Sequence, residues 1–135
     1  MDPGDQRVAS IHLDSGPANY EQHIQAGRHR LVSDEPSSIG GADAGPAPYA
    51  LVLAGLAACT SITLRMYADR KGWELGPVHV DAALGRHGEE ERVERTIKVA
   101  PALTPEQRAK LAEIAEKTPV TKSLKRAFTI VTTVV

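Results

Sequence analysis

This chain of 135 residues is 41% hydrophobic and carries a formal net charge of −1. The length predicts a single domain over residues 1–135 that buries about two-thirds of its unfolded surface and folds without disulfides or metal. Basic residues are dispersed among acidic ones, so we expect no nucleic-acid binding. One cysteine permits no intrachain disulfide, and the first residues lack a signal-peptide pattern, so we expect a cytoplasmic protein.

The first third of the chain predicts three short strands. Residues 8–14 alternate between two faces, as a half-buried strand does, and Gly16-Pro17 then supplies a turn. Residues 20–26 and 28–33 flank Gly27 and form two further strands. Residues 34–48 contain three glycines and three prolines without periodicity, which predicts a loop.

A long helix is predicted from Pro48 to Gly72. Proline suits the first helical turn, Arg70 and Lys71 suit the last one, and glycine caps the end. The N-terminal half is apolar on nearly all sides, so it needs cover on every side, and we expect much of it from a second subunit. The apolar run 49–64 is shorter than the roughly 20 residues that cross a bilayer, so we expect no membrane insertion.

The last third returns to alternating sequence. Residues 78–84 and 93–99 predict a hairpin around the charged segment 85–91. Thr104, Pro105 and Gln107 form the signature of a helix start with a capping box, and this helix ends before Pro119. Residues 127–135 are rich in β-branched side chains and predict a final strand. The resulting order, β-β-β-α-β-β-α-β, indicates an α+β fold.

Three blocks of sequence carry a family resemblance. They are Gly40-Gly-Ala-Asp-Ala-Gly-Pro-Ala-Pro-Tyr49, Ala57-Ala-Cys-Thr60 and Leu64-Arg-Met-Tyr-Ala-Asp-Arg-Lys-Gly-Trp73. The chain, from about Ile24 to its end, resembles the OsmC/Ohr superfamily, and specifically its OsmC-like branch. This resemblance implies an OsmC-like fold, in which antiparallel strands wrap a long central apolar helix. It also implies an intertwined homodimer with a redox site at the subunit boundary.

The resemblance makes Cys59 the candidate catalytic residue. Members of the superfamily reduce organic hydroperoxides with a peroxidatic and a resolving cysteine, and Cys59 matches the first. Thr118 stands at the position of the missing resolving cysteine, so an intrachain disulfide step cannot occur. The arginine and glutamate that the superfamily places near the first strand's end and at the central helix's start have no counterpart in residues 15–19 and 48–50.

The surroundings of Cys59 on its own helix are uncharged. We expect a pocket of four apolar or aromatic side chains, Tyr49, Val52, Leu56 and Met66. A thiolate needs nearby positive charge or hydrogen-bond donors. That charge must come from another segment or a partner subunit, and the candidates are Arg28, Arg30, Arg65 and Lys122.

Two functions remain open from the sequence. The first is a one-Cys, thiol-dependent reductase of organic hydroperoxides in oxidative stress defence, in which Cys59 is restored by an external thiol. The second is a redox-inactive dimer that binds an apolar small molecule or has a structural role. We expect no cofactor. The five histidines lack cysteine or carboxylate partners at metal spacing, so we also expect no metal site.

Overall fold

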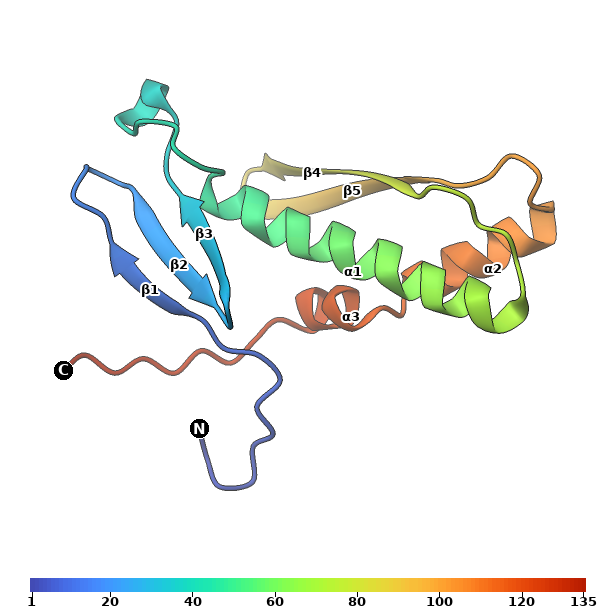
Figure 1. Cartoon of the computed structure of the whole chain (residues 1–135), viewed down its shortest axis with the longest axis horizontal. Coiled ribbons are helices and arrows are strands. Elements are labelled where there is room, and N and C mark those ends of the chain that lie inside the picture. The colour runs from blue at the N-terminus through green and yellow to red at the C-terminus, as the bar shows by residue number, and fades with distance from the viewer. The chain divides into compact units, whose positions relative to one another are not determined.

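The computed structural model describes residues 1–135 and has an α+β fold (Figure 1). Its elements are β1 (His12–Ser15), β2 (Gln22–Ala26), β3 (His29–Ser33), the 3-10 turn η1 (Ser37–Ile39), α1 (Pro48–Lys71), β4 (His79–His87), β5 (Glu90–Lys98), α2 (Pro105–Ala115) and α3 (Pro119–Arg126). Contacts within the chain separate two compact units, residues 1–51 and 52–135. That both belong to one domain stays a prediction.

The first unit contains an antiparallel sheet in the order β1-β2-β3. Leu13 lies opposite Ile24, and Ile24 opposite Leu31, so one face carries an apolar row across the three strands. The alternation had predicted a strand from residue 8, but strand β1 begins at His12. The reason is pairing: the register with β2 begins with His12 opposite Gln25, and no residue before His12 pairs with β2.

The loop after β3 is organised by one buried carboxylate. Asp34 is 2% exposed, and it accepts hydrogen bonds from the backbone N–H groups of Glu35 at 2.8 Å, Ala42 at 3.2 Å and Ala44 at 3.1 Å. Burial alone would raise the pKa of the Asp34 carboxyl, but these three donors outweigh burial and lower its pKa below the ordinary value. The segment predicted as a loop is therefore ordered around its first residue.

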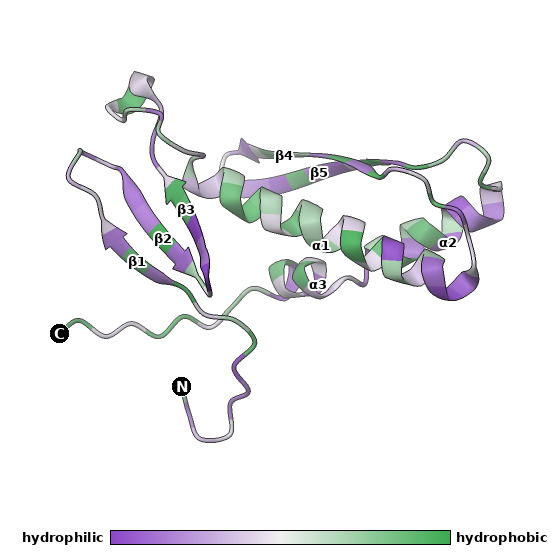
Figure 2. Cartoon of the chain, viewed as in Figure 1, coloured by the Kyte–Doolittle hydropathy of each residue, from purple (hydrophilic) through white to green (hydrophobic).

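Helix α1 begins at Pro48 as predicted and its last residue is Lys71, after which Gly72, whose φ is 70°, ends the helix as the capping glycine. Within its own chain it buries only one stripe, at a spacing of four residues: Leu56, Thr60, Leu64 and Ala68. Much of the remaining surface of α1 is apolar (Figure 2). The whole helix is long and apolar enough to cross a membrane by length and composition, with 17% of its most apolar window buried. From the shorter run 49–64 we expected no membrane insertion, and this stays a prediction, because a mostly buried core helix of a soluble protein passes the same test.

The second unit packs α1 and α2 against the β4–β5 hairpin. Its core is a cluster of buried side chains from these helices and the connecting loops: Leu64, Ala68, Leu75, Leu103, Leu111 and Ala115. The predicted capping box at Thr104 is confirmed, with Gln107 donating its backbone N–H to the threonine hydroxyl at 3.1 Å. Both hairpin strands extend further into the turn than predicted, to His87 and from Glu90, because Gly88, at φ 62°, allows a tight turn.

The C-terminal part of the second unit differs from the prediction. Residues 119–126 form α3, which the sequence analysis missed, and residues 127–135 form no strand. A strand needs a hydrogen-bonded neighbour, and none of the five strands pairs with this segment. Its apolar side chains are exposed, Phe128 by 65% and Ile130 by 83%. The element order is therefore β-β-β-α-β-β-α-α.

Candidate functional site

Cys59 lies in the middle of α1, at the edge of the buried stripe. Its side chain is half-buried, and its Sγ lies 3.9 Å from the hydroxyl of Thr63 on the next turn. At about 100° per residue, Val52 and Met66 fall on the same side of the helix as Cys59. These two side chains are 48% and 54% exposed, whereas Leu56, on the core side of Cys59, is 5% exposed. The thiol therefore sits between the core and an open apolar face.

The other predicted site residues lie in different surroundings. Tyr49 belongs to the first turn of α1, in the unit of residues 1–51, and is 56% exposed. Arg28 and Arg30 also belong to that unit, before and within β3. Arg65 shares a unit with Cys59, but its guanidinium donates a hydrogen bond to the Gly76 carbonyl after the end of α1. Their roles at the thiol stay predictions.

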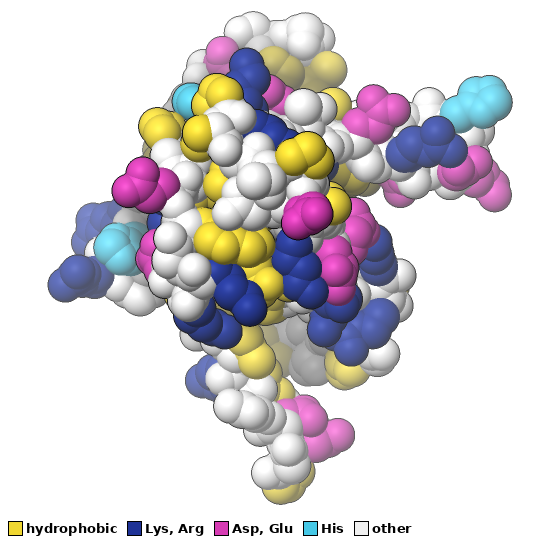
Figure 3. Space-filling view, turned by 90° about the vertical axis from the view of Figure 1, so that its right-hand side faces the viewer, with side chains coloured by type: hydrophobic (Ala, Val, Ile, Leu, Met, Phe, Trp, Pro, Cys, Tyr) yellow, Lys and Arg dark blue, Asp and Glu magenta, His cyan; other side chains and the backbone are white.

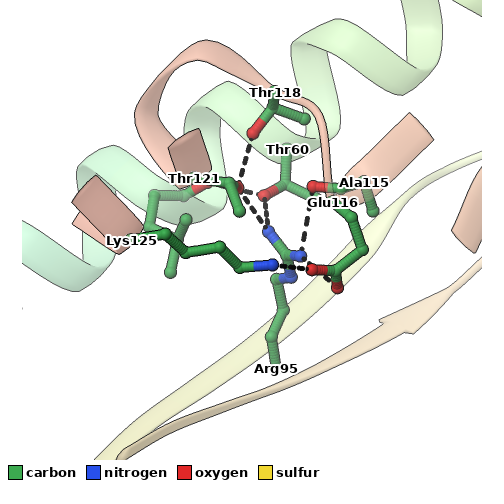
Figure 4. A network of polar contacts seen from close by, with 8 residues as sticks. Thr60, Arg95, Ala115, Glu116, Thr118, Thr121 and Lys125 are labelled. Atoms are coloured by element: carbon green, nitrogen blue, oxygen red, sulfur yellow. Dashed lines mark hydrogen bonds and ion pairs between the residues drawn. The ribbon is translucent and has the colours of Figure 1, made fainter. Parts of the chain in front are cut away.

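The sequence analysis missed Arg95, which is the centre of a polar network that includes Thr60, the residue after Cys59 (Figure 4). Its side chain projects from β5 and is 11% exposed. Its Nη1 donates to the hydroxyls of Thr60 and Thr121, each at 2.9 Å. Its Nη2 donates to the Ala115 carbonyl at 3.2 Å and to Glu116 at 3.4 Å. One guanidinium thus joins β5 to α1, to α3 and to the end of α2.

Thr118, the predicted position of the missing resolving cysteine, belongs to the same network. It is fully buried at the N-cap of α3, and its hydroxyl lies 2.6 Å from that of Thr121. Thr60 directly follows Cys59 in the chain. The network therefore connects the turn that carries the thiol with position 118.

An ion pair closes the exposed side of this network. Glu116 receives a hydrogen bond from Lys125 of α3 in addition to the one from Arg95. The hydrogen bond from Lys125 lowers the pKa of Glu116 below its ordinary value, and the positive charges of Lys125 and Arg95 add to this effect against partial burial. Both side chains are more than half exposed, so the pair contributes little stability.

Arg95 and Glu116 line two cavities. One, of about 300 Å³, is lined by apolar side chains, among them Leu64 and Leu111 of the core, and by Arg108. The other, of about 420 Å³, is lined by Leu56, Val93 and Leu124 together with Thr121 and Lys125. Leu56 is one turn from Cys59, so the second cavity reaches the helix beside the thiol.

The sequence of β5 contains a signal for the Arg95 network. Val93, Arg95 and Ile97 alternate on one face of β5, and Val99 continues this row just after the strand, so the pattern places one arginine in an apolar row. A buried arginine is rare unless it is paired, so an arginine in an apolar row was the sequence signal for the network.

No group of three or more histidine, cysteine, aspartate or glutamate side chains is placed to hold a metal ion. On the face drawn in Figure 3, basic and acidic side chains are interspersed.

Comparison with known protein families places the chain. The family model described as OsmC-like protein matches residues 40–133, a stretch that contains Cys59, Arg95 and Thr118. The chain belongs to the OsmC-like family. No curated protein matches it.

Solved structures of OsmC-like proteins show the same fold. An OsmC-like protein from Mycoplasma pneumoniae has a TM-score of 0.76 at 15% identity, over 90% of this chain and 89% of that one. An organic hydroperoxide resistance protein OsmC from Legionella pneumophila has a TM-score of 0.64 at 20% identity, over 90% and 91%. The organic hydroperoxide resistance protein OhrB of Bacillus subtilis has a TM-score of 0.61 at 23% identity, over 88% and 91%.

Proposed function

We propose that this OsmC-like protein is a one-Cys, thiol-dependent reductase of organic hydroperoxides that acts in oxidative stress defence in the cytoplasm. The observation that carries the proposal is the placement of the one thiol. Cys59 is half-buried in the middle of the fold's long helix, beside an open apolar face, and it is the only cysteine of the chain. Organic hydroperoxide resistance proteins from Legionella pneumophila and Bacillus subtilis have the same fold.

The proposed reaction has two stages. The Cys59 thiolate attacks the terminal oxygen of the hydroperoxide, so that an S–O bond forms, the O–O bond breaks and the alkoxide leaves as an alcohol after taking a proton. Cys59 is then a sulfenic acid, two electrons more oxidised. An external thiol attacks this sulfur and releases water, and a second thiol frees Cys59 as the external disulfide leaves.

A homodimer completes this proposal. The exposed apolar side chains of α1, among them Val52, Ile62 and Met66, need cover that the chain's own second unit does not give them. Segment 127–135, which is rich in β-branched side chains and has no strand partner in its own chain, is suited to pair with a strand of a second copy. Positive charge that activates the thiol then comes from another segment or from the partner subunit, with Arg28, Arg30, Arg65 and Lys122 as the candidates.

Sulfenic acid formation tests the proposal. The reduced protein is titrated with cumene hydroperoxide, and the mass of the peptide that contains Cys59 is followed, with Cys59→Ser as the control. We expect the wild-type peptide to gain one oxygen and the variant to gain none. If Cys59 gains no oxygen at concentrations that oxidise a known thiol peroxidase, the enzymatic proposal fails.

One observation favours a second candidate, a redox-inactive dimer that binds an apolar small molecule. The cavity beside Leu56 has a volume of about 420 Å³, within the range of small-molecule sites, and its lining combines the apolar Val93 and Leu124 with charged side chains such as Glu91 and Lys125. Binding of an apolar fluorescent probe that Leu56→Trp abolishes, together with an unreactive Cys59, would support this candidate over the reductase.

A further inference from the structure

We propose that Arg95 is a positioning residue for Cys59: it fixes the turn of α1 that carries the thiol against α3. This inference rests on the proposed function, because it concerns the oxidation of Cys59. The geometry is a single guanidinium between Thr60 and Thr121, 2.9 Å from each hydroxyl (Figure 4). Thr60 is the residue after Cys59, and Thr121 lies in the first turn of α3.

The hydroxyl groups in the network have defined donors and acceptors. Thr60 donates its hydroxyl proton to the Leu56 carbonyl at 2.7 Å, so its oxygen is left to accept from Arg95. Thr121 also accepts from Arg95, and it shares a further hydrogen bond with Thr118. Thr60 and Thr118 are fully buried, and no buried side-chain nitrogen or oxygen lacks a partner. Loss of the guanidinium therefore removes the only link between the hydroxyls of α1 and α3 in this network.

An arginine suits this position better than a lysine. The guanidinium presents five N–H donors in a rigid plane, and here it reaches acceptors on α1, α3 and the end of α2 at once. An ammonium on a flexible stem does not hold these directions together. The alignment of a nucleophile with its substrate is sensitive to such constraints, because a displacement of about 1 Å can cost on the order of 100-fold in rate.

Arg95→Met tests the proposal through two rates of opposite expected direction. The first is oxidation of Cys59 by cumene hydroperoxide, which needs an aligned thiol. The second is alkylation by iodoacetamide across pH 6–10, which needs only access. We expect Arg95→Met to slow oxidation at least tenfold and to speed alkylation at high pH at least threefold, because the loosened turn exposes the thiol. The pH midpoint of alkylation stays unchanged. Both rates of Arg95→Lys should lie between those of wild type and Arg95→Met.

Thr60→Val keeps the test decisive if Arg95→Met does not fold. It cuts the link to α1 but leaves the bonds from Arg95 to Thr121 and Ala115, and it should reproduce both rate changes. The double variant should equal Arg95→Met alone, because the hydrogen bond that Thr60→Val removes is already absent in Arg95→Met. The matched control is Arg92→Met on the same strand, whose side chain is 72% exposed, and both its rates should stay within twofold of wild type.

Each contrary result has a defined meaning. Equal rates in wild type and both variants would reduce Arg95 to a structural residue and overturn the proposal. A raised alkylation midpoint in Arg95→Met would also overturn it, because Arg95 would then act on the thiol by its charge. If wild-type Cys59 is not oxidised but alkylation still rises in both variants, the reductase proposal fails while the positioning of the Cys59 turn by Arg95 is upheld.

Discussion

Two neighbouring truncations on α1, Leu64→Ala and Ile62→Ala, separate the core face of this helix from its open face. Leu64 is fully buried in the cluster with Leu75, Leu111 and Ala115, all less than 5% exposed. Leucine-to-alanine changes at such sites cost about 2–5 kcal/mol, because the lost burial is joined by a cavity that close-packed neighbours do not fill. We expect this cost at any protein concentration.

Ile62 is 55% exposed in its own chain, so its truncation should behave differently. Burying an isoleucine fully is worth about 1.5–3 kcal/mol, so covering the exposed half is worth about 1 kcal/mol. A symmetric dimer contains this residue twice, which gives about 2 kcal/mol, or roughly a 30-fold weaker dimer at 1.4 kcal/mol per factor of ten. The fold of the separate chain should lose less than about 1 kcal/mol.

Urea denaturation at two protein concentrations, together with sedimentation equilibrium, measures both effects. Leu64→Ala should lower the free energy of unfolding by an amount that does not depend on protein concentration. Ile62→Ala should shift the monomer–dimer equilibrium. A Leu64→Ala cost no larger than that of Ile62→Ala would refute the assignment of the two faces, and an unchanged dimer affinity in Ile62→Ala would refute the proposed cover of the open face.

Three further outcomes follow from the structure. The pKa of Asp34 is lowered in the folded state, so its stabilisation is present above the unfolded pKa of about 3.9 and is lost as the pH falls through the folded value. Thermal melts should therefore show Asp34→Asn less stable than wild type at pH 7, with the gap closing in acid; a gap independent of pH would contradict this. Gly41→Ala should destabilise the protein, because its Cβ would lie 1.8 Å from the Glu35 carbonyl oxygen, whereas Gly85→Ala, with no atom within 4 Å, should change the melting temperature little. Deletion of residues 128–135 should leave the helical circular dichroism signal intact but weaken the proposed dimer, and an unaltered sedimentation coefficient would argue against strand pairing by this segment.

Local patterns predicted most of the fold. The proline, the basic last turn and the glycine of α1 act within a few residues of each helix end, so they placed Pro48 and Gly72 correctly. The capping box at Thr104 is equally local. A second threonine-proline pair, Thr118 and Pro119, stands at the start of α3, with proline at the first helical position but without a capping box.

Features that depend on distant partners were not predictable in the same way. The segment 127–135 has strand propensity, but propensity describes fit to a sheet and does not supply the neighbouring strand. Arg95 finds Thr60 and Thr121 at separations of 35 and 26 residues along the chain. Alternation in β5 assigns Arg95 to the apolar face, but only the fold identifies its hydroxyl partners. The sequence therefore predicted Cys59, but it did not predict the hydrogen bonds from Arg95 to Thr60 and Thr121.

Peroxide consumption with an external thiol tests the role of Cys59 most directly. Purified protein is mixed with cumene hydroperoxide, with and without dithiothreitol, and the remaining peroxide is measured against Cys59→Ser. A one-Cys reductase should consume many equivalents of peroxide per chain with dithiothreitol and stop near one equivalent without it, and the variant should consume none above background. Consumption by Cys59→Ser equal to that of the wild type would contradict the assignment of Cys59 as the reacting thiol.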